Sequence, residues 1–444
     1  MQHTSSLALA VALAALGIQH AGAAGFLEDS KATLGLRNFY INADQRHGGG
    51  ATQEEWGQGF LLNYTSGYTQ GTVGFGVDAL GLLGIKLDSG RGRHGNPTSA
   101  NYGGIVFPTD EDGRAVDEFS HLGLTGKLRI SKTEARLGTL QPKLPVVTFN
   151  DGRLLPQTFE GGQITSSEID RLTLVAGQLE HAKGRNSSDA RGLSIGGANN
   201  AQTGQFSNTF RYAGADYRFT DTLTGQYYVG NLEDFYQQHF LGLLHVQPLP
   251  VGSLKTDLRY FDSRADGKNG RAAGRAEGYR SSGYWRAGDP DSGEVDNRTW
   301  SALLTWSVGG HALSAGYQQV SGDSAFPFLN QGDGATAYLI TDRQIGKFLS
   351  AGERTWLAEY GYDFASLGAP GLKTVVTYLS GDRIDSAQGD RKEWERDLRI
   401  DYTLPDGPLK GLGVSWRNAT FRTNTSASDL DENRLIVSYS LPLL

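Results

Sequence analysis

Apolar and polar side chains alternate one by one in many separate stretches of this chain. In 299–308 (TWSALLTWSV) the even-numbered residues are all apolar, and the odd-numbered ones are polar except for Leu303. In 397–404 (DLRIDYTL) the even-numbered residues are again apolar and the odd-numbered ones polar. A period of two residues is the signature of a β-strand with two different faces. The pattern predicts an all-β fold.

The alternating stretches number about seventeen, and each is about ten residues long. Their connections differ in length. Tight turns are predicted at 130–134, 219–223, 307–311, 367–371 and 404–411, whereas long loops are predicted at 84–117, 142–166, 181–205, 262–297 and 321–354. Short turns on one side and long loops on the other are typical of an antiparallel up-and-down barrel.

Composition excludes several other classes of protein. The hydrophobic content of 38% is below the roughly 45–50% of a soluble domain, yet the chain holds 19 Tyr, 19 Phe and 7 Trp. This balance favours many half-buried strands over thick cores. A net charge of −7 gives no indication of nucleic-acid binding, and the absence of cysteine excludes disulfides and thiolate metal sites.

The N-terminal segment predicts export from the cytoplasm. An apolar run over 7–18 is followed by the small residues Ala21, Gly22 and Ala23, which is the pattern of a cleaved signal peptide. The run is shorter than the about 20 residues that a membrane-spanning helix needs. We therefore expect a signal peptide over 1–23 and a mature chain over 24–444.

Charged residues recur in the middle of strands, on the polar face, and they allow two interpretations. In a soluble protein this face would meet water outside, whereas in a membrane barrel it would line the lumen while the apolar face meets lipid. The export signal, the strand length, the flanking Trp and Tyr and the low hydrophobic content together favour the membrane barrel. The charged residues are Lys127, Arg129, Lys255, Asp257, Arg259, Arg399, Asp401 and Arg417.

Several stretches carry a resemblance to a known family. They are GFLEDSKATLGLRNFYINAD (25–44), the segment 54–88, GKLRISKTEARLGTLQPKLPV (126–146), RLLPQTFEGGQITSSEID (153–170) and the tail RLIVSYSLPLL (434–444). Together they resemble the OprD family of substrate-specific outer-membrane porins, over essentially the whole mature chain.

This resemblance implies a monomeric barrel of about 18 strands in the bacterial outer membrane, in contact with lipid and lipopolysaccharide. It implies passive uptake of small carboxylate-bearing molecules, without a cofactor or a metal. It also implies a constriction formed by inward-folded loops, chiefly the third (about 142–166) and the seventh (about 321–354), and a ladder of arginines and lysines along one wall. The sequence of 144–159 resembles the branch of the family that takes aromatic monocarboxylates more than the branch that takes basic amino acids.

Strand parity selects the candidate ladder residues. A carboxylate that enters a narrow lumen loses water, and fixed cations can replace that hydration while still letting it leave. Arginine suits this role because its planar guanidinium binds carboxylates bidentately and stays charged. The candidates on the polar faces of strands are Arg37, Lys127, Arg129, Arg259, Arg399 and Arg417. Each could instead form a salt bridge that only holds the shape of the barrel.

The loops supply further candidates. Arg153 lies in NDGRLLPQTFEGG (150–162), where Leu154, Leu155 and Phe159 could pack the loop against the inner wall and hold the arginine at the narrowest point. Acidic residues opposite the ladder would impose a transverse field on a passing solute. Asp333 and Asp342, in the long loop 330–350, are the candidates for that role.

Two alternatives stay open on the sequence. One is a channel of the same family for basic amino acids or peptides. The other is a secreted β-rich protein that binds carbohydrate or hydrolyses it, with its aromatic residues stacking on sugars. No nucleotide-binding loop, nucleophile elbow or metal-binding histidine pair stands in the sequence, so we expect a channel and not an enzyme.

Overall fold

The structure is a computed structural model. It describes residues 25–46, 52–90, 92–95, 103–197, 205–283, 285, 291–330, 336–425 and 427–444. The predicted signal peptide, 1–23, lies outside these residues. None of the helices in the described part of the chain is long and apolar enough to cross a membrane.

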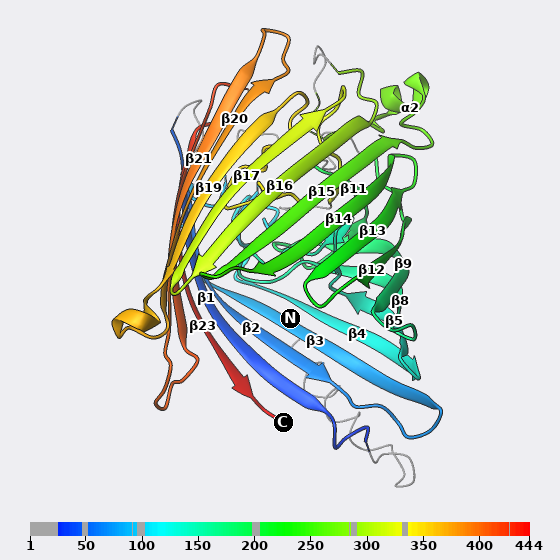
Figure 1. The fold of residues 1–444 in the computed structure, drawn as a ribbon, viewed down its shortest axis with the longest axis vertical. Helices are drawn as coiled ribbons and strands as arrows, with labels where there is room; N and C mark the ends of the chain where they lie inside the picture. Colours follow the sequence, from blue (N-terminus) through cyan, green and yellow to red (C-terminus); the bar gives the residue numbers. More distant parts are fainter. Residues whose placement is uncertain are drawn as a thin grey trace.

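The described residues form a closed antiparallel barrel of 18 strands, as predicted (Figure 1). Every strand pairs with its neighbours along the chain, and β1 also pairs with the last strand, β23, which closes the sheet on itself. The strands are β1 (Lys31–Gln45), β2 (Gln53–Thr65), β3 (Val73–Asp88), β4 (Glu118–Ile130), β5 (Thr133–Leu140), β8 (Thr158–Ser166), β9 (Leu172–Lys183), β12 (Phe210–Arg218), β13 (Leu223–Leu232), β14 (Tyr236–Pro248), β15 (Ser253–Ala265), β16 (Asp296–Val308), β17 (His311–Ser321), β19 (Arg354–Asp363), β20 (Leu372–Ile384), β21 (Arg391–Thr403), β22 (Gly413–Thr423) and β23 (Leu430–Pro442).

The remaining elements are short and belong to the connections. Strand β10 (Ala190–Gly192) folds back onto the end of β9. Two small ladders lie outside the barrel sheet, β6 (Lys143–Leu144) with β7 (Val147–Thr148) and β11 (Ser194–Ile195) with β18 (Leu329–Asn330). One helical turn, α2 (Ala272–Glu277), stands in the loop between β15 and β16, and a 3-10 turn, η1 (Phe364–Leu367), joins β19 to β20.

The two faces of the barrel wall follow the alternation in the sequence. On β15, Leu258 points outward with 39% of its surface exposed, whereas the neighbouring Asp257 points inward and is 6% exposed. Large apolar side chains such as Leu124 (57%) and Trp356 (66%) are exposed on the outer surface. A contiguous apolar outer face around a polar interior is the arrangement of a barrel that lies in lipid.

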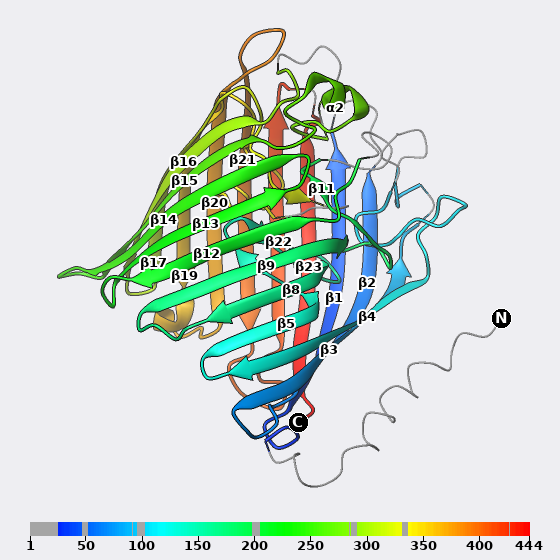
Figure 2. The same cartoon turned by 90° about the vertical axis from the view of Figure 1, so that its right-hand side faces the viewer.

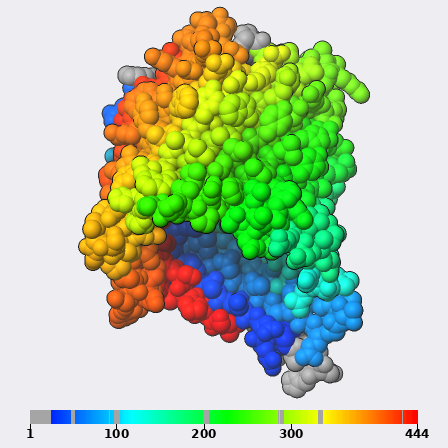
Figure 3. Space-filling view, viewed as in Figure 1, coloured from blue at the N-terminus to red at the C-terminus, as the bar shows by residue number. Residues whose placement is uncertain are grey.

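Long loops and short turns lie at opposite ends of the barrel (Figures 1 and 2). The long loops include the one with α2, at the top of both views, and short turns such as 131–132, 249–252 and 309–310 lie at the other end. Counted along the chain, the third loop spans 141–157 and the seventh spans 322–353. At the short-turn end the molecule is hollowed between the wall drawn in green and the wall drawn in blue and red (Figure 3).

The loop predicted over 142–166 is shorter in the structure, because Thr158–Ser166 forms β8. Strand β8 is the one barrel strand that was not among the seventeen alternating stretches of the sequence. The pair Gly161-Gly162 looks like a turn in the sequence, but β8 pairs with both β5 and β9, and its register shifts between Glu160 and Gly161. A Cβ on Gly161 would lie 2.1 Å from the Gln178 carbonyl oxygen, so this glycine permits a close approach of two strands at a bulge.

Candidate functional site

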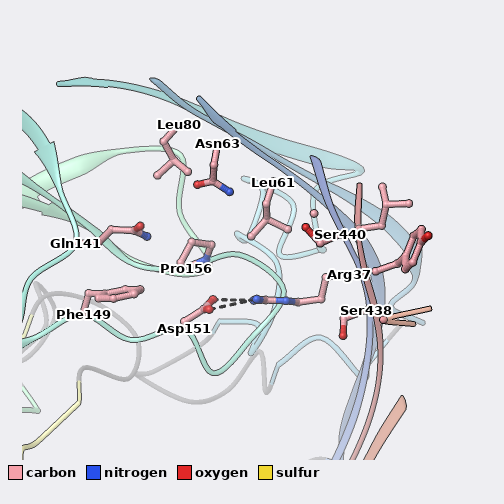
Figure 4. A pocket seen from close by; sticks show the side chains of 14 residues that line it. Arg37, Leu61, Asn63, Leu80, Gln141, Phe149, Asp151, Pro156, Ser438 and Ser440 are labelled. Atoms are coloured by element: carbon pink, nitrogen blue, oxygen red, sulfur yellow. Dashed lines mark hydrogen bonds and ion pairs between the residues drawn. The ribbon is translucent and has the colours of Figure 1, made fainter. Parts of the chain in front are cut away.

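The third loop crosses the lumen and is tied to the barrel wall by Arg37 of β1. The Arg37 guanidinium donates to both carboxylate oxygens of Asp151, at 2.7 and 3.2 Å, and to the backbone oxygen of Arg153 at 2.7 Å. Figure 4 shows Arg37 reaching from the wall to Asp151 across a cavity of about 350 Å³. The bidentate contact fixes the position of the loop as well as its charge.

Apolar packing holds the same loop from behind. Leu154 and Leu155 are fully buried in a cluster with Phe39 and Ile41 of β1, and burying each leucine contributes about 1.5–3 kcal/mol. The third loop approaches β2 at a place where the inward face of this strand carries glycines and therefore has no side chains. A Cβ on Gly57 would meet the Leu154 side chain at 2.8 Å, and one on Gly59 would meet it at 3.1 Å. These glycines make room for the loop.

The seventh loop is held by a carboxylate of the same wall, three strands away from β1. Glu395 of β21 is buried and accepts the backbone N–H groups of Gln344 (3.2 Å), Ile345 (3.0 Å) and Gly346. Arg434 of β23 contacts both inward loops, because it donates to the backbone oxygens of Gln344 (3.0 Å) and Gly152 (3.4 Å). The two inward loops are thereby fixed to each other and to the wall.

Three arginines occupy one row of the lumen wall on neighbouring strands. In the strand register Arg399 of β21 lies opposite Arg417 of β22, which lies opposite Arg434 of β23. Directly opposite positions on paired strands are about 4.5–5.5 Å apart, so these like charges crowd together. The row places three cations side by side on this wall.

Below the third loop this wall borders a cavity of about 760 Å³. Its cations include Arg37, Lys373, Arg399 and Arg417, and Arg153 of the third loop also lines it. Carboxylates neutralise three of the four wall cations. Lys373 pairs with Asp363 at 3.1 Å, Arg399 with Asp401 at 2.5 Å and Arg37 with Asp151.

Arg417 differs from its neighbours in this cavity. Its Nε donates to the Ser415 hydroxyl at 3.2 Å, and the structure gives it no ion pair with any carboxylate in the described part of the chain. It is half-buried and lies between Arg399 and Arg434. Its positive charge is therefore available to a solute in the cavity.

The other candidates from the sequence lie elsewhere. Lys127 is buried, pairs with Asp78 at 2.6 Å and donates to the Ser66 backbone oxygen at 2.7 Å. Arg129 is exposed at the end of β4, where its guanidinium lies 4.1 Å from the centroid of the Tyr68 ring. Neither residue lines the 760 Å³ cavity. Burial and a hydrogen bond to Glu134 raise the pKa of the Tyr68 phenol, which lies in the turn before β3.

Arg259 and Asp342 organise the seventh loop. Arg259 pairs with Asp257 at 2.7 Å, donates to the Tyr338 backbone oxygen at 3.2 Å and stacks over its ring at 4.1 Å. Asp342 contacts Lys347 of the same loop at 2.9 and 3.0 Å. Asp333 lies outside the described residues. Arg153 donates to the Ile105 backbone oxygen, so its guanidinium also contacts the loop 89–117 between β3 and β4.

Sequence reasoning missed Arg434, Lys373 and Asp151. Arg434 alternates with Leu435 and Val437 and so was visible from strand parity. Lys373 was hidden because its strand is apolar on both faces, with Val375 and Val376 side by side. Asp151 lies in a loop, where no periodicity indicates which side chains point into the lumen.

The fold and the site define a class: a transmembrane β-barrel channel whose lumen is narrowed by two fixed inward loops and lined by basic residues on one wall. Comparison with known proteins gives the family. The model of the family described as "outer membrane porin, OprD family" matches residues 24–443. The chain belongs to the OprD family, and it is a substrate-specific porin of the bacterial outer membrane.

Individual relatives agree with this assignment. The crystal structure of Pseudomonas aeruginosa OccK8 (OprE) is 61% identical, with a TM-score of 0.87 over 95% of this chain and 100% of that chain. Pseudomonas aeruginosa OpdK, solved with vanillate, is 38% identical, with a TM-score of 0.82 over 94% and 100%. The porin-like protein GalP of Pseudomonas putida is 38% identical over 99% of this chain and 97% of GalP. The resemblance noted in the sequence is confirmed.

Proposed function

We propose that this porin takes up small carboxylate-containing molecules passively, and that single-ring aromatic monocarboxylates such as benzoate are its preferred class. The observation that carries the proposal is Arg417, a half-buried cation in the lumen between two other arginines. A carboxylate that reaches it gains a charge-assisted hydrogen bond without displacing a protein carboxylate. Paired neighbours, by contrast, must first give up their own partners.

The remaining cations extend this site into a path. Arg153 and Arg37 lie at the third loop, and Arg399 and Lys373 lie beside Arg417 in the same cavity. A solute that moves between successive cations stays partly compensated at each step, which permits entry as well as release. The fixed charges select the sign of the solute, and the two loops limit its size.

Three features support an aromatic acid in particular. The cavity of about 760 Å³ falls within the about 300–1,000 Å³ typical of small-molecule sites. The partly buried Ile436 lines it together with the cations, so an apolar ring and a carboxylate both find partners. The relative OpdK was solved with vanillate, which is an aromatic carboxylate.

We also propose that one chain forms the complete pore in a lipopolysaccharide-containing membrane. The pairing of β1 with β23 closes the barrel within a single copy, so no second copy is needed to build the lumen.

Reversal potentials in planar bilayers test the substrate class. Under a gradient of potassium benzoate the proposal predicts that benzoate carries more current than potassium, and under a gradient of arginine hydrochloride that chloride carries more than the arginine cation. A greater permeability to the arginine cation would instead support the alternative channel for basic amino acids.

A further inference from the structure

A row of acidic residues lies directly above the arginine row on the same wall. In the strand register Glu359 of β19 lies opposite Thr377, Thr377 opposite Asp397, Asp397 opposite Ala419, and Ala419 opposite Glu432. Each acid is two residues along its strand from the arginine row, toward the long loops. Two residues correspond to about 6.4–6.8 Å along a strand. An anion that enters from the long-loop end must therefore pass this acidic row before it reaches Arg417.

The barrel wall compensates only part of this negative charge. Glu432 accepts from Arg434 of its own strand at 2.7 Å. Glu359 accepts a hydrogen bond from the Thr377 hydroxyl at 2.9 Å, but its cationic partner comes from the seventh loop. The Arg343 guanidinium lies 3.5 Å from the Glu359 carboxylate and also acts electrostatically on Asp397.

The position of Arg343 is fixed by the loop that carries it. The next three backbone N–H groups, those of Gln344, Ile345 and Gly346, bind Glu395 one lumen-facing step above Asp397. The Arg343 side chain is 28% exposed and that of Glu359 is 24% exposed. Both side chains are thus partly exposed to the lumen, so their charges act on a solute that passes.

We propose that Arg343 is a specificity-determining residue, which covers the acidic row with positive charge so that anions reach the arginine row against less repulsion. This inference rests on the proposed uptake of carboxylates, and it adds a residue of the seventh loop to the residues of the wall. The seventh loop then has two roles. It narrows the lumen, and it makes the potential above Arg417 less negative.

The test is the ratio of anion to cation permeability, from reversal potentials in planar bilayers under a KCl gradient. We expect Arg343→Gln to lower this ratio on the order of threefold, because it exposes one uncompensated carboxylate in a partly screened site. Glu359→Gln should raise the ratio, and the double variant should return it to near the wild-type value. Restoration by the second substitution is a result that displacement of the loop alone would not give.

Arg298→Gln is the matched control. Arg298 also lies 3.5 Å from a carboxylate, that of Asp296, but the pair is on the outer face of the barrel. Its loss removes the same charge from the protein and should leave the permeability ratio unchanged. Heat-dependent gel mobility, which reports the closed barrel, shows whether each variant has folded, and Arg343→Lys should keep the wild-type ratio.

The outcomes separate this inference from the proposed function. If the wild-type porin excludes benzoate, the proposed function fails. If the wild-type porin prefers benzoate but Arg343→Gln leaves the KCl ratio unchanged, or if Glu359→Gln does not reverse its effect, then Arg343 does not act by covering the acidic row. If Arg343→Gln does not fold, a fall of the ratio in Glu359→Gln overturns the proposal.

Discussion

Replacing Arg417 with alanine removes the cation that we expect to bind the substrate carboxylate most strongly. A hydrogen bond to a charged group contributes about 1.5–3 kcal/mol, and each 1.4 kcal/mol corresponds to about a tenfold change in affinity. Because the lumen of a porin is filled with water and Arg417 is only half-buried, the lower end of this range applies. Arg417→Ala should therefore weaken benzoate binding roughly tenfold.

The assay is the concentration of benzoate that halves the chloride current through single channels. Arg417→Lys keeps the charge but loses the planar guanidinium, so its half-blocking concentration should lie between those of the wild type and Arg417→Ala. The control is the double variant Arg399→Gln and Asp401→Asn. It removes a pair whose partners already neutralise each other at 2.5 Å, and it should change benzoate binding less than Arg417→Ala does.

Two results would refute this reasoning. One is an unchanged half-blocking concentration in Arg417→Ala, which would mean that the unpaired arginine is not the binding position. The other is a larger effect from the neutral double variant than from Arg417→Ala. In that case the ion pairs, and not the unpaired charge, would determine affinity.

Three further predictions concern the loop and the wall. Arg153→Ala should lower benzoate uptake into liposomes while the single-channel conductance in KCl is retained, and unchanged uptake would exclude the role given to this residue. Gly59→Ala should displace the third loop, because the new Cβ would lie 3.1 Å from the Leu154 carbonyl oxygen, and the KCl conductance should change. Lys127→Met should leave the half-buried Asp78 with only the more distant Arg136, at 3.9 Å, and cost about 1–3 kcal/mol of stability. The loss should appear as a lower temperature of the gel-mobility shift, with selectivity unchanged; a normal transition temperature would contradict the structural role.

The alternation in the sequence predicted the strands and which side chains share a face, and the export signal, the strand length and the composition then favoured the membrane barrel. Arg37, Arg259, Arg399 and Arg417 alternate with apolar neighbours, and all four point inward in the structure. Parity gives the face of a residue because the side-chain period of a strand is two. It does not give the height of the residue in the lumen or its partner.

Register and loop contacts supply what parity lacks. Lys127 shares the inward face, but the pairing of β3 with β4 places it beside Asp78, where it is buried. Arg259 is bound to a loop about 80 residues further along the chain, through the Tyr338 backbone oxygen. Strand β8 was missed because a glycine pair that serves a bulge is locally indistinguishable from one that serves a turn.

The central claim is that a positively charged constriction selects small carboxylates. Its most direct test is the rate at which proteoliposomes containing the wild-type porin take up radiolabelled benzoate, compared with arginine and with a neutral sugar of similar size. The account predicts that benzoate enters fastest and arginine slowest. Arginine entering faster than benzoate, or all three solutes entering at equal rates, would contradict it.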